Sequence, residues 1–136
     1  MKVKNEKELG KALHDDVDSI EVEGDLANKV IKIKATGKVA WGVLIGCMAI
    51  AIPIVYTTVA SAGTASIVTV PALAGVMAPS IATLGVGATV SAVSIAAGAT
   101  IAAGGKSKIT AGVAGLRKLR QYKITKNGNG ITLKKK

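Results

Sequence analysis

The sequence is dominated by one uncharged stretch, residues 39–105, which reads VAWGVLIGCMAIAIPIVYTTVASAGTASIVTVPALAGVMAPSIATLGVGATVSAVSIAAGATIAAGG. It contains no Asp, Glu, Lys, Arg or His. One membrane-crossing helix needs only about 20 apolar residues, so this stretch has room for two crossings and a connection. A water-soluble fold interleaves polar and apolar residues along its elements, whereas this chain separates them. The sequence therefore predicts a mainly α-helical membrane protein built on a two-helix transmembrane hairpin.

Glycines and prolines divide the uncharged stretch. We expect a first crossing over residues 39–60, with Trp41 near the lipid interface where indole rings are enriched, and a second over residues 80–104. Residues 61–79 are apolar, but they include four residues that disfavour a helix: Gly63, Pro71, Gly75 and Pro79. A re-entrant or interfacial linker fits this segment, because non-helical backbone at membrane depth must be shielded by protein or by a watery cavity.

Both predicted crossings carry small residues at helical spacing. In the first, the small residues on one side are Gly42, Gly46, Ala49, Pro53, Thr57 and Ala60. The larger residues fall mostly on the other side and are Leu44, Met48, Ile52, Val55 and Val59. In the second, the stripe comprises Ser80, Thr83, Gly87, Ser91, Ser94, Gly98, Ala102 and Gly105. Small residues let helix backbones approach closely in lipid. The stripes predict glycine-zipper packing, of the two crossings against each other or between copies of the chain, through Gly42, Gly46, Gly87, Ser91, Ser94 and Gly98.

The charge is distributed unevenly along the chain. Residues 1–38 hold eight acids and eight lysines, whereas residues 106–136 hold ten Lys or Arg and no acid. A basic block beside a membrane segment is retained on the cytoplasmic side and meets anionic headgroups there. We therefore expect an inner-membrane protein with both termini cytoplasmic, and no nucleic-acid partner. The predicted contacts with anionic lipid are Lys106, Lys108, Arg117, Lys118 and Arg120.

The N-terminal segment, residues 1–38, predicts a strand–helix–strand unit followed by a juxtamembrane helix. Asn5 is a candidate N-cap for the first helix. Residues 19–23 alternate with period two, as a half-buried strand does, and Gly24 closes them. Asp25 is expected to cap the juxtamembrane helix, whose apolar stripe is Leu26, Val30 and Ile33.

The C-terminal segment, residues 106–136, predicts a basic amphipathic helix and then a β-hairpin. Ile109, Val113, Leu116 and Leu119 share one face of the helix. The run Asn127-Gly128-Asn129-Gly130 between two alternating segments is a strong hairpin signal, because Asn and Gly tolerate positive φ. An isolated hairpin is only marginally stable. We therefore expect it to join Val3 and the residue 19–23 strand in a small cytoplasmic α+β cap.

No catalytic or metal-binding constellation is recognisable. The single histidine, His14, lacks a nucleophile or a second ligand in register, and the single cysteine, Cys47, lies in the apolar stretch. The acids between Asp15 and Asp25 lack the glycine and the terminal glutamate of a calcium loop. Gly104-Gly105-Lys106-Ser107 does not lie between a strand and a helix, as a phosphate-binding loop would. We expect no enzymatic activity and no cofactor.

At both ends the chain resembles a group of short, uncharacterised bacterial membrane proteins with a glycine-rich apolar middle and a basic C-terminal tail. The matching segments are Glu8-Leu9-Gly10-Lys11-Ala12-Leu13, Glu23-Gly24-Asp25-Leu26-Ala27, and Tyr122 together with Leu133-Lys134-Lys135-Lys136. The resemblance implies the same architecture and no particular activity.

Three hypotheses for function follow. The first is a self-assembling membrane protein that forms a homo-oligomer, either a pore or membrane-permeabilising effector or a scaffold of the membrane. The second is a membrane-anchored binding or scaffold module that recruits a protein or anionic lipid through its cytoplasmic cap. The third is a soluble β-rich assembly, favoured by the Val, Ile and Thr content of residues 54–70.

Overall fold

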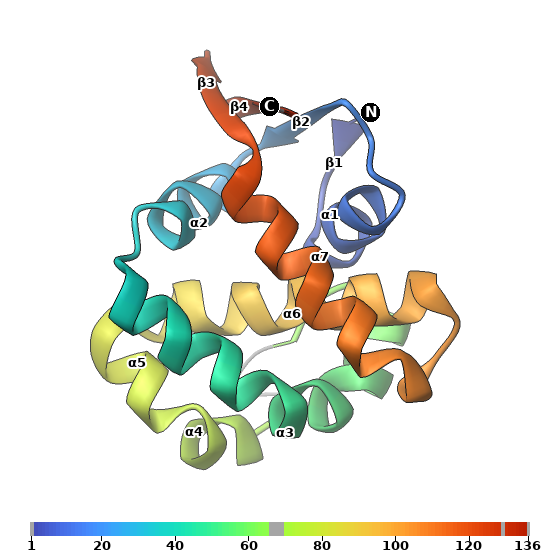
Figure 1. Cartoon of the computed structure of the whole chain (residues 1–136), viewed down its shortest axis with the longest axis vertical. Helices are drawn as coiled ribbons and strands as arrows, with labels where there is room; N and C mark the ends of the chain where they lie inside the picture. Colours follow the sequence, from blue (N-terminus) through green and yellow to red (C-terminus); the bar gives the residue numbers. More distant parts are fainter. Residues whose placement is uncertain (1, 66–69, 129, 136) are drawn as a thin grey trace.

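The fold is mainly helical with one small sheet (Figure 1), which confirms that part of the prediction. The computed structural model describes residues 2–65, 70–128 and 130–135, apart from the side chains of Lys106 and Asn127. Its N-terminal elements are β1 (Lys2–Val3), α1 (Glu6–His14), β2 (Ser19–Glu23), α2 (Asp25–Lys34) and α3 (Lys38–Ala62). The remaining elements are α4 (Ala72–Val76), α5 (Ala78–Leu84), α6 (Val86–Ala103), η1 (Lys106–Lys108), α7 (Ile109–Gln121), β3 (Lys123–Asn127) and β4 (Gly130–Lys134).

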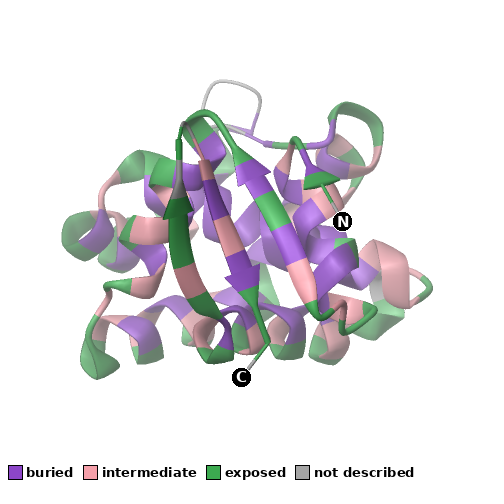
Figure 2. Ribbon diagram, turned by 90° about the horizontal axis from the view of Figure 1, so that it is seen from above, coloured by how far each residue is buried: buried purple, intermediate pink, exposed green. Residues whose placement is uncertain are grey.

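The two ends of the chain meet in one sheet. Its strand order is β1-β2-β4-β3, in which β1 and β2 are parallel and the other pairs are antiparallel. Ile20 pairs with Leu133 and Val22 with Ile131, so these apolar side chains share the buried face. Figure 2 shows this alternation of buried and exposed residues along the strands that lie over the helices. Residues more than a hundred positions apart therefore share one core.

Local sequence signals explain most element boundaries. The N–H of Glu8 donates to the side-chain oxygen of Asn5 over 2.9 Å, so Asn5 caps α1 as predicted. The prediction that Asp25 caps the next helix is wrong. Helix α2 already includes Asp25, and Gly24 occupies the N-cap position with a φ of +69° that favours glycine. The acid at Asp25 instead lies in the first turn, where the helix dipole favours negative charge.

The predicted hairpin is present at the C-terminus. Strands β3 and β4 pair from Lys123 with Lys134 to Asn127 with Gly130. Gly128 adopts a φ of +55° in the connection. Asn129 lies outside the described residues.

The predicted linker and second crossing are subdivided in the structure. Residues 72–84 form α4 and α5, so the linker is partly helical, and residues 66–69 lie outside the described part of the chain. Gly85, with a φ of +87°, separates α5 from α6, because an L-residue rarely adopts that conformation within a helix. Residues 54–62 belong to α3, so the β-rich alternative is wrong for that part of the chain.

Helix α6 is the core of the fold. Every residue from Ala88 to Thr100 is buried. The α-helices that pack against it include α1, α2, α3, α5 and α7. Both α3 and α6 are long and apolar enough to cross a membrane by length and composition, but only 33% of the most apolar window of α3 is buried inside the chain, against 72% for α6. The rest of the chain therefore buries most of this window in α6 but only a third of it in α3.

Candidate functional site

Close contacts at glycines attach α1 and α7 to α6. A Cβ added at Gly98 would lie 2.7 Å from the Cα and the carbonyl oxygen of Lys7 in α1. A Cβ added at Gly115 of α7 would likewise lie 2.7 Å from the Cβ of Ala99 in α6. Such distances leave no room for a side chain. The small residues of α6 are thus used for packing within the chain, against helices that come from its two ends.

The hydroxyl groups of the predicted second stripe are also engaged internally. The Ser91 hydroxyl donates to the Glu6 carboxylate over 3.4 Å, and Ser94 accepts from the backbone N–H of Ala65 over 3.1 Å. Glu6, Ser91 and Ser94 are all buried. In this conformation, neither Ser91 nor Ser94 is available to line a path between copies.

The side of α3 that faces away from the core is the small-residue side. The large residues predicted to share the other side are all buried: Leu44, Met48, Ile52, Val55 and Val59. The small residues that are exposed are Gly42, Gly46, Ala49, Pro53 and Thr57. We call these five residues the α3 small-residue face. Apolar neighbours extend it, since Val39 is 85% exposed and Ile50 is 61% exposed.

The α3 small-residue face has room for another helix. A Cβ added at Gly42 or at Gly46 would meet no atom of the described residues within 4 Å. Gly87, at the start of α6, is exposed as well, and a Cβ added there would lie 3.9 Å from the Lys29 side chain. Of the six residues predicted for helix packing, the structure therefore leaves these three glycines accessible and buries Ser91, Ser94 and Gly98.

A groove of about 550 Å³ runs between the N-terminal half of α3 and the C-terminal half of α7. Two of the predicted lipid contacts, Arg117 and Arg120, line it. The other residues that line it are Lys38, Trp41, Gly42, Ile45, Gly46 and Gln121. The Arg120 guanidinium lies 5.4 Å from the centre of the Trp41 ring. The groove thus combines cations from both helices with an apolar wall.

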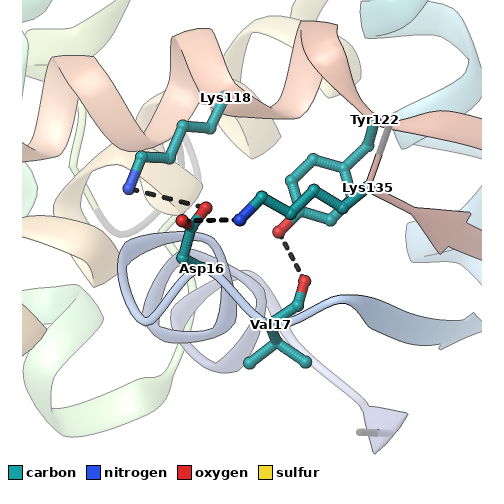
Figure 3. Close-up of polar contacts among 5 residues, drawn as sticks. All are labelled: Asp16, Val17, Lys118, Tyr122 and Lys135. Atoms are coloured by element: carbon teal, nitrogen blue, oxygen red, sulfur yellow. Dashed lines mark hydrogen bonds and ion pairs between the residues drawn. The ribbon is translucent and has the colours of Figure 1, made fainter.

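The other predicted lipid contacts lie elsewhere. Lys118 is 3.9 Å from Asp16, a carboxylate that also pairs with Lys135 at 2.8 Å (Figure 3). The hydrogen bond from Lys135 holds the pKa of Asp16 below its ordinary value. Lys108 is exposed on η1, and the side chain of Lys106 is outside the described part. The Lys118 side chain therefore interacts with Asp16, where α7 packs beside the α1–β2 turn.

Lysines from α1 and α2 cap two helix C-termini. The Lys34 ammonium donates to the carbonyls of Leu119 and Arg120, each over 2.9 Å, at the end of α7. The Lys7 ammonium donates to the carbonyl of Ala60 over 2.9 Å, near the end of α3. Positive charge at a helix C-terminus offsets the partial negative charge of the last carbonyls. These contacts attach the charged N-terminal segment to the apolar helix α3 and to the basic helix α7.

Sequence reasoning did not identify several residues of this arrangement. Gly10, Gly112 and Gly115 make close contacts with α6, and Lys38 joins the groove. The spacing of Gly112 and Gly115 with Leu116 and Leu119 was a usable signal, because all four fall on one helical face. Gly10 shares one face of α1 with Leu9 and Leu13 in the same way, but the sequence does not show which segment that face contacts.

Among the residues that the structure describes, no group of three or more His, Cys, Asp or Glu side chains is placed to hold a metal ion. Cys47 is a free thiol of intermediate exposure. Comparisons of the chain with protein-family models, curated proteins and solved structures find no match. The fold and the surface of α3 are thus the basis for a functional proposal.

Proposed function

We propose that this chain is a small, non-enzymatic membrane protein that contacts the bilayer through α3 and assembles with copies of itself through the α3 small-residue face. The observation that carries the proposal is the exposure of that face on a 25-residue helix without an acid and with Lys38 as its only cation. Helices in lipid associate through close backbone packing and not through the hydrophobic effect, so open glycines are suited to this contact.

The burial of α6 supports α3 as the helix that meets lipid first. Charged helices α1 and α7 enclose α6, and burying them in a bilayer would place lysines and acids in hydrocarbon at a cost of several kcal/mol each. A hairpin that crosses the bilayer with both α3 and α6 therefore requires α1 and α7 to separate from α6. We propose that the enclosed form is the one that reaches the membrane, and that the hairpin forms there.

The pairing of both ends in one sheet supports a common side for the two termini. The basic tail favours the cytoplasmic side of a bacterial inner membrane. Permeabilisation of the membrane is the activity we propose for the assembly. Because residues 39–105 contain no ionisable group other than Cys47 and Tyr56, we expect a path without strong ion selectivity.

The test is a pair of matched glycine substitutions in the full chain. Gly42→Leu with Gly46→Leu fills the α3 small-residue face. Gly75→Leu is the control, because a Cβ at position 75 in α4 also meets nothing within 4 Å in the part of the chain that the structure describes. We expect the double variant, compared with the wild type at equal amounts of membrane-bound protein, to lose cross-linked oligomers and dye release from vesicles. The control should retain both. Equal oligomer size in all three proteins would contradict assembly through this face.

A second candidate is a membrane-anchored module that recruits a protein through the terminal sheet. The position of β3 at the edge of the sheet favours it, since an edge strand offers unpaired backbone groups to another chain. If this candidate is correct, Gly42→Leu with Gly46→Leu leaves recruitment of the partner protein intact. Replacing Thr125 on β3 with proline would instead abolish recruitment of the partner protein, because proline removes a backbone N–H from the edge strand.

A further inference from the structure

The groove between α3 and α7 has the chemistry of an anion site. Lys38, Arg117 and Arg120 contribute three cations, and no carboxylate is among the described residues that line it. Arginine guanidinium groups bind phosphate oxygens in a bidentate manner. The C-terminus of α7 carries partial negative charge, which would repel an anion. Lys34 offsets this charge, because its ammonium donates to the carbonyls of Leu119 and Arg120.

One wall of the groove is apolar and partly preorganised. Trp41 is only 7% exposed, and its ring holds the Arg120 guanidinium at a cation–π distance of 5.4 Å. Ile45 and Gly46 line the same wall. From Gly46 the uncharged surface continues along α3 through Ala49, Ile50 and Pro53, which are exposed. Cations at one end and a continuous apolar surface at the other match an amphipathic ligand.

We propose that this groove binds the phosphate headgroup of an anionic phospholipid, with Lys38, Arg117 and Arg120 on the phosphate and the acyl chains along the exposed side of α3. This assignment rests on the proposed membrane function and names its lipid partner. A soluble phosphate would use the cations but leave the apolar surface without a partner. A nucleic acid would contact more of the basic tail than Arg117 and Arg120.

The experiment is flotation of the full chain with vesicles of phosphatidylcholine alone or of phosphatidylcholine mixed with phosphatidylglycerol. The groove variant is Arg117→Gln with Arg120→Gln. The control is Lys123→Gln with Lys126→Gln, which removes the same charge from exposed positions on β3. Because Arg117 and Arg120 line the groove and would contact the phosphate, whereas Lys123 and Lys126 do not line it, we expect the groove variant to bind mixed vesicles about tenfold or more weakly, and the control to bind within about threefold of the wild type.

Trp41 provides an independent readout, because it is the only tryptophan in the chain. Phosphatidylglycerol with brominated acyl chains should quench its fluorescence in the wild type and in the control. In the groove variant, quenching should fall even at lipid concentrations that restore flotation. Circular dichroism spectra that match the wild type will show that the groove variant is folded.

The outcomes separate the two proposals. Failure to float with either vesicle overturns the membrane function and the lipid site together. Equal binding to neutral and mixed vesicles leaves the membrane function standing but overturns the lipid site. Equal losses in the groove variant and the control show a general charge effect and also overturn it. Release of the protein from mixed vesicles by excess inorganic phosphate, or by an oligonucleotide at the same ionic strength, overturns the assignment to lipid.

Discussion

Gly98 of α6 lies directly against the backbone of Lys7 in α1, where a Cβ would come within 2.7 Å of the Lys7 carbonyl oxygen. Two helices that are far apart in the sequence are thereby held at backbone contact. The contact covers the side of α6 that carries the Ser91 and Ser94 hydroxyl groups. It is also the feature that most directly distinguishes the enclosed form from an open transmembrane hairpin.

Gly98→Ala should therefore destabilise the enclosed form. Forcing a methyl group into a filled space costs about 1–3 kcal/mol. The matched change Gly46→Ala adds a methyl group in open space on α3 and should raise the free energy of unfolding by up to about 1 kcal/mol, since alanine favours helix over glycine. Urea unfolding followed by circular dichroism measures both. If the two variants unfold at the same urea concentration, α1 does not pack on α6 as described.

The shared sheet predicts that both termini lie in the same compartment. Because β2 pairs along its length with β4, the ends cannot separate without breaking the strand pairing. Reporter domains fused in turn to each end of the full chain should give the same compartment in intact cells. Reporters on opposite sides of the membrane would exclude both the sheet and the hairpin topology.

Lys34→Met should loosen the junction between α2 and α7. The variant keeps the apolar stem but removes the two hydrogen bonds to the carbonyls of Leu119 and Arg120, with an expected loss of about 1–2 kcal/mol in the free energy of unfolding. Lys32→Met is the control, since Lys32 is an exposed neighbour with the same charge. Hydrogen exchange should speed up at the end of α7 in the first variant only. Equal exchange rates in the two variants would show that the cap contributes nothing.

Tyr122→Phe tests the connection between α7 and the turn before β2. The Tyr122 hydroxyl donates to the Val17 carbonyl over 2.6 Å (Figure 3), so its removal should cost about 1–2 kcal/mol. Burial raises the pKa of Tyr122 above its ordinary value, and the Asp16 charge acts in the same direction. Because the folded state disfavours the phenolate, the tyrosine's contribution is complete below about pH 10 and is lost as pH rises through the folded-state pKa.

The wild type should therefore exceed Tyr122→Phe in stability at neutral pH, and the difference should shrink under alkaline conditions. Urea midpoints at both pH values measure it. A difference that stays constant with pH would place the Tyr122 hydroxyl in water in the folded protein.

Much of the local structure was predictable because it depends on residues close together in the chain. Asn5 caps its helix, residues 19–23 form a strand, and the Asn-Gly turn closes a hairpin, each through backbone preferences of a few residues. The division of α3 into a large-residue side and a small-residue side was also predictable from helical periodicity. The break between α5 and α6 at Gly85 was not predicted, because glycine is frequent throughout residues 39–105 and most glycines there lie within helices.

The candidate groove was only half predictable. Arg117 and Arg120 were expected to meet anionic lipid because they lie in a basic tail. Their placement beside Lys38 and Trp41 depends on how α7 crosses α3, which no local pattern specifies. The same holds for Lys118, whose position on α7 turns it toward Asp16 and away from the groove.

The amino-acid sequence alone determined which residues share a face of each element and where charge is absent, because periodicity and composition are properties of the chain itself. Only the tertiary structure decided which small-residue face is covered. Helix α1 covers the stripe of α6 at Ser91 and Gly98, whereas the small-residue face of α3 stays open. The physical reason is that a glycine permits close approach by any helix, and the one that occupies the space is selected by packing between segments distant in the sequence.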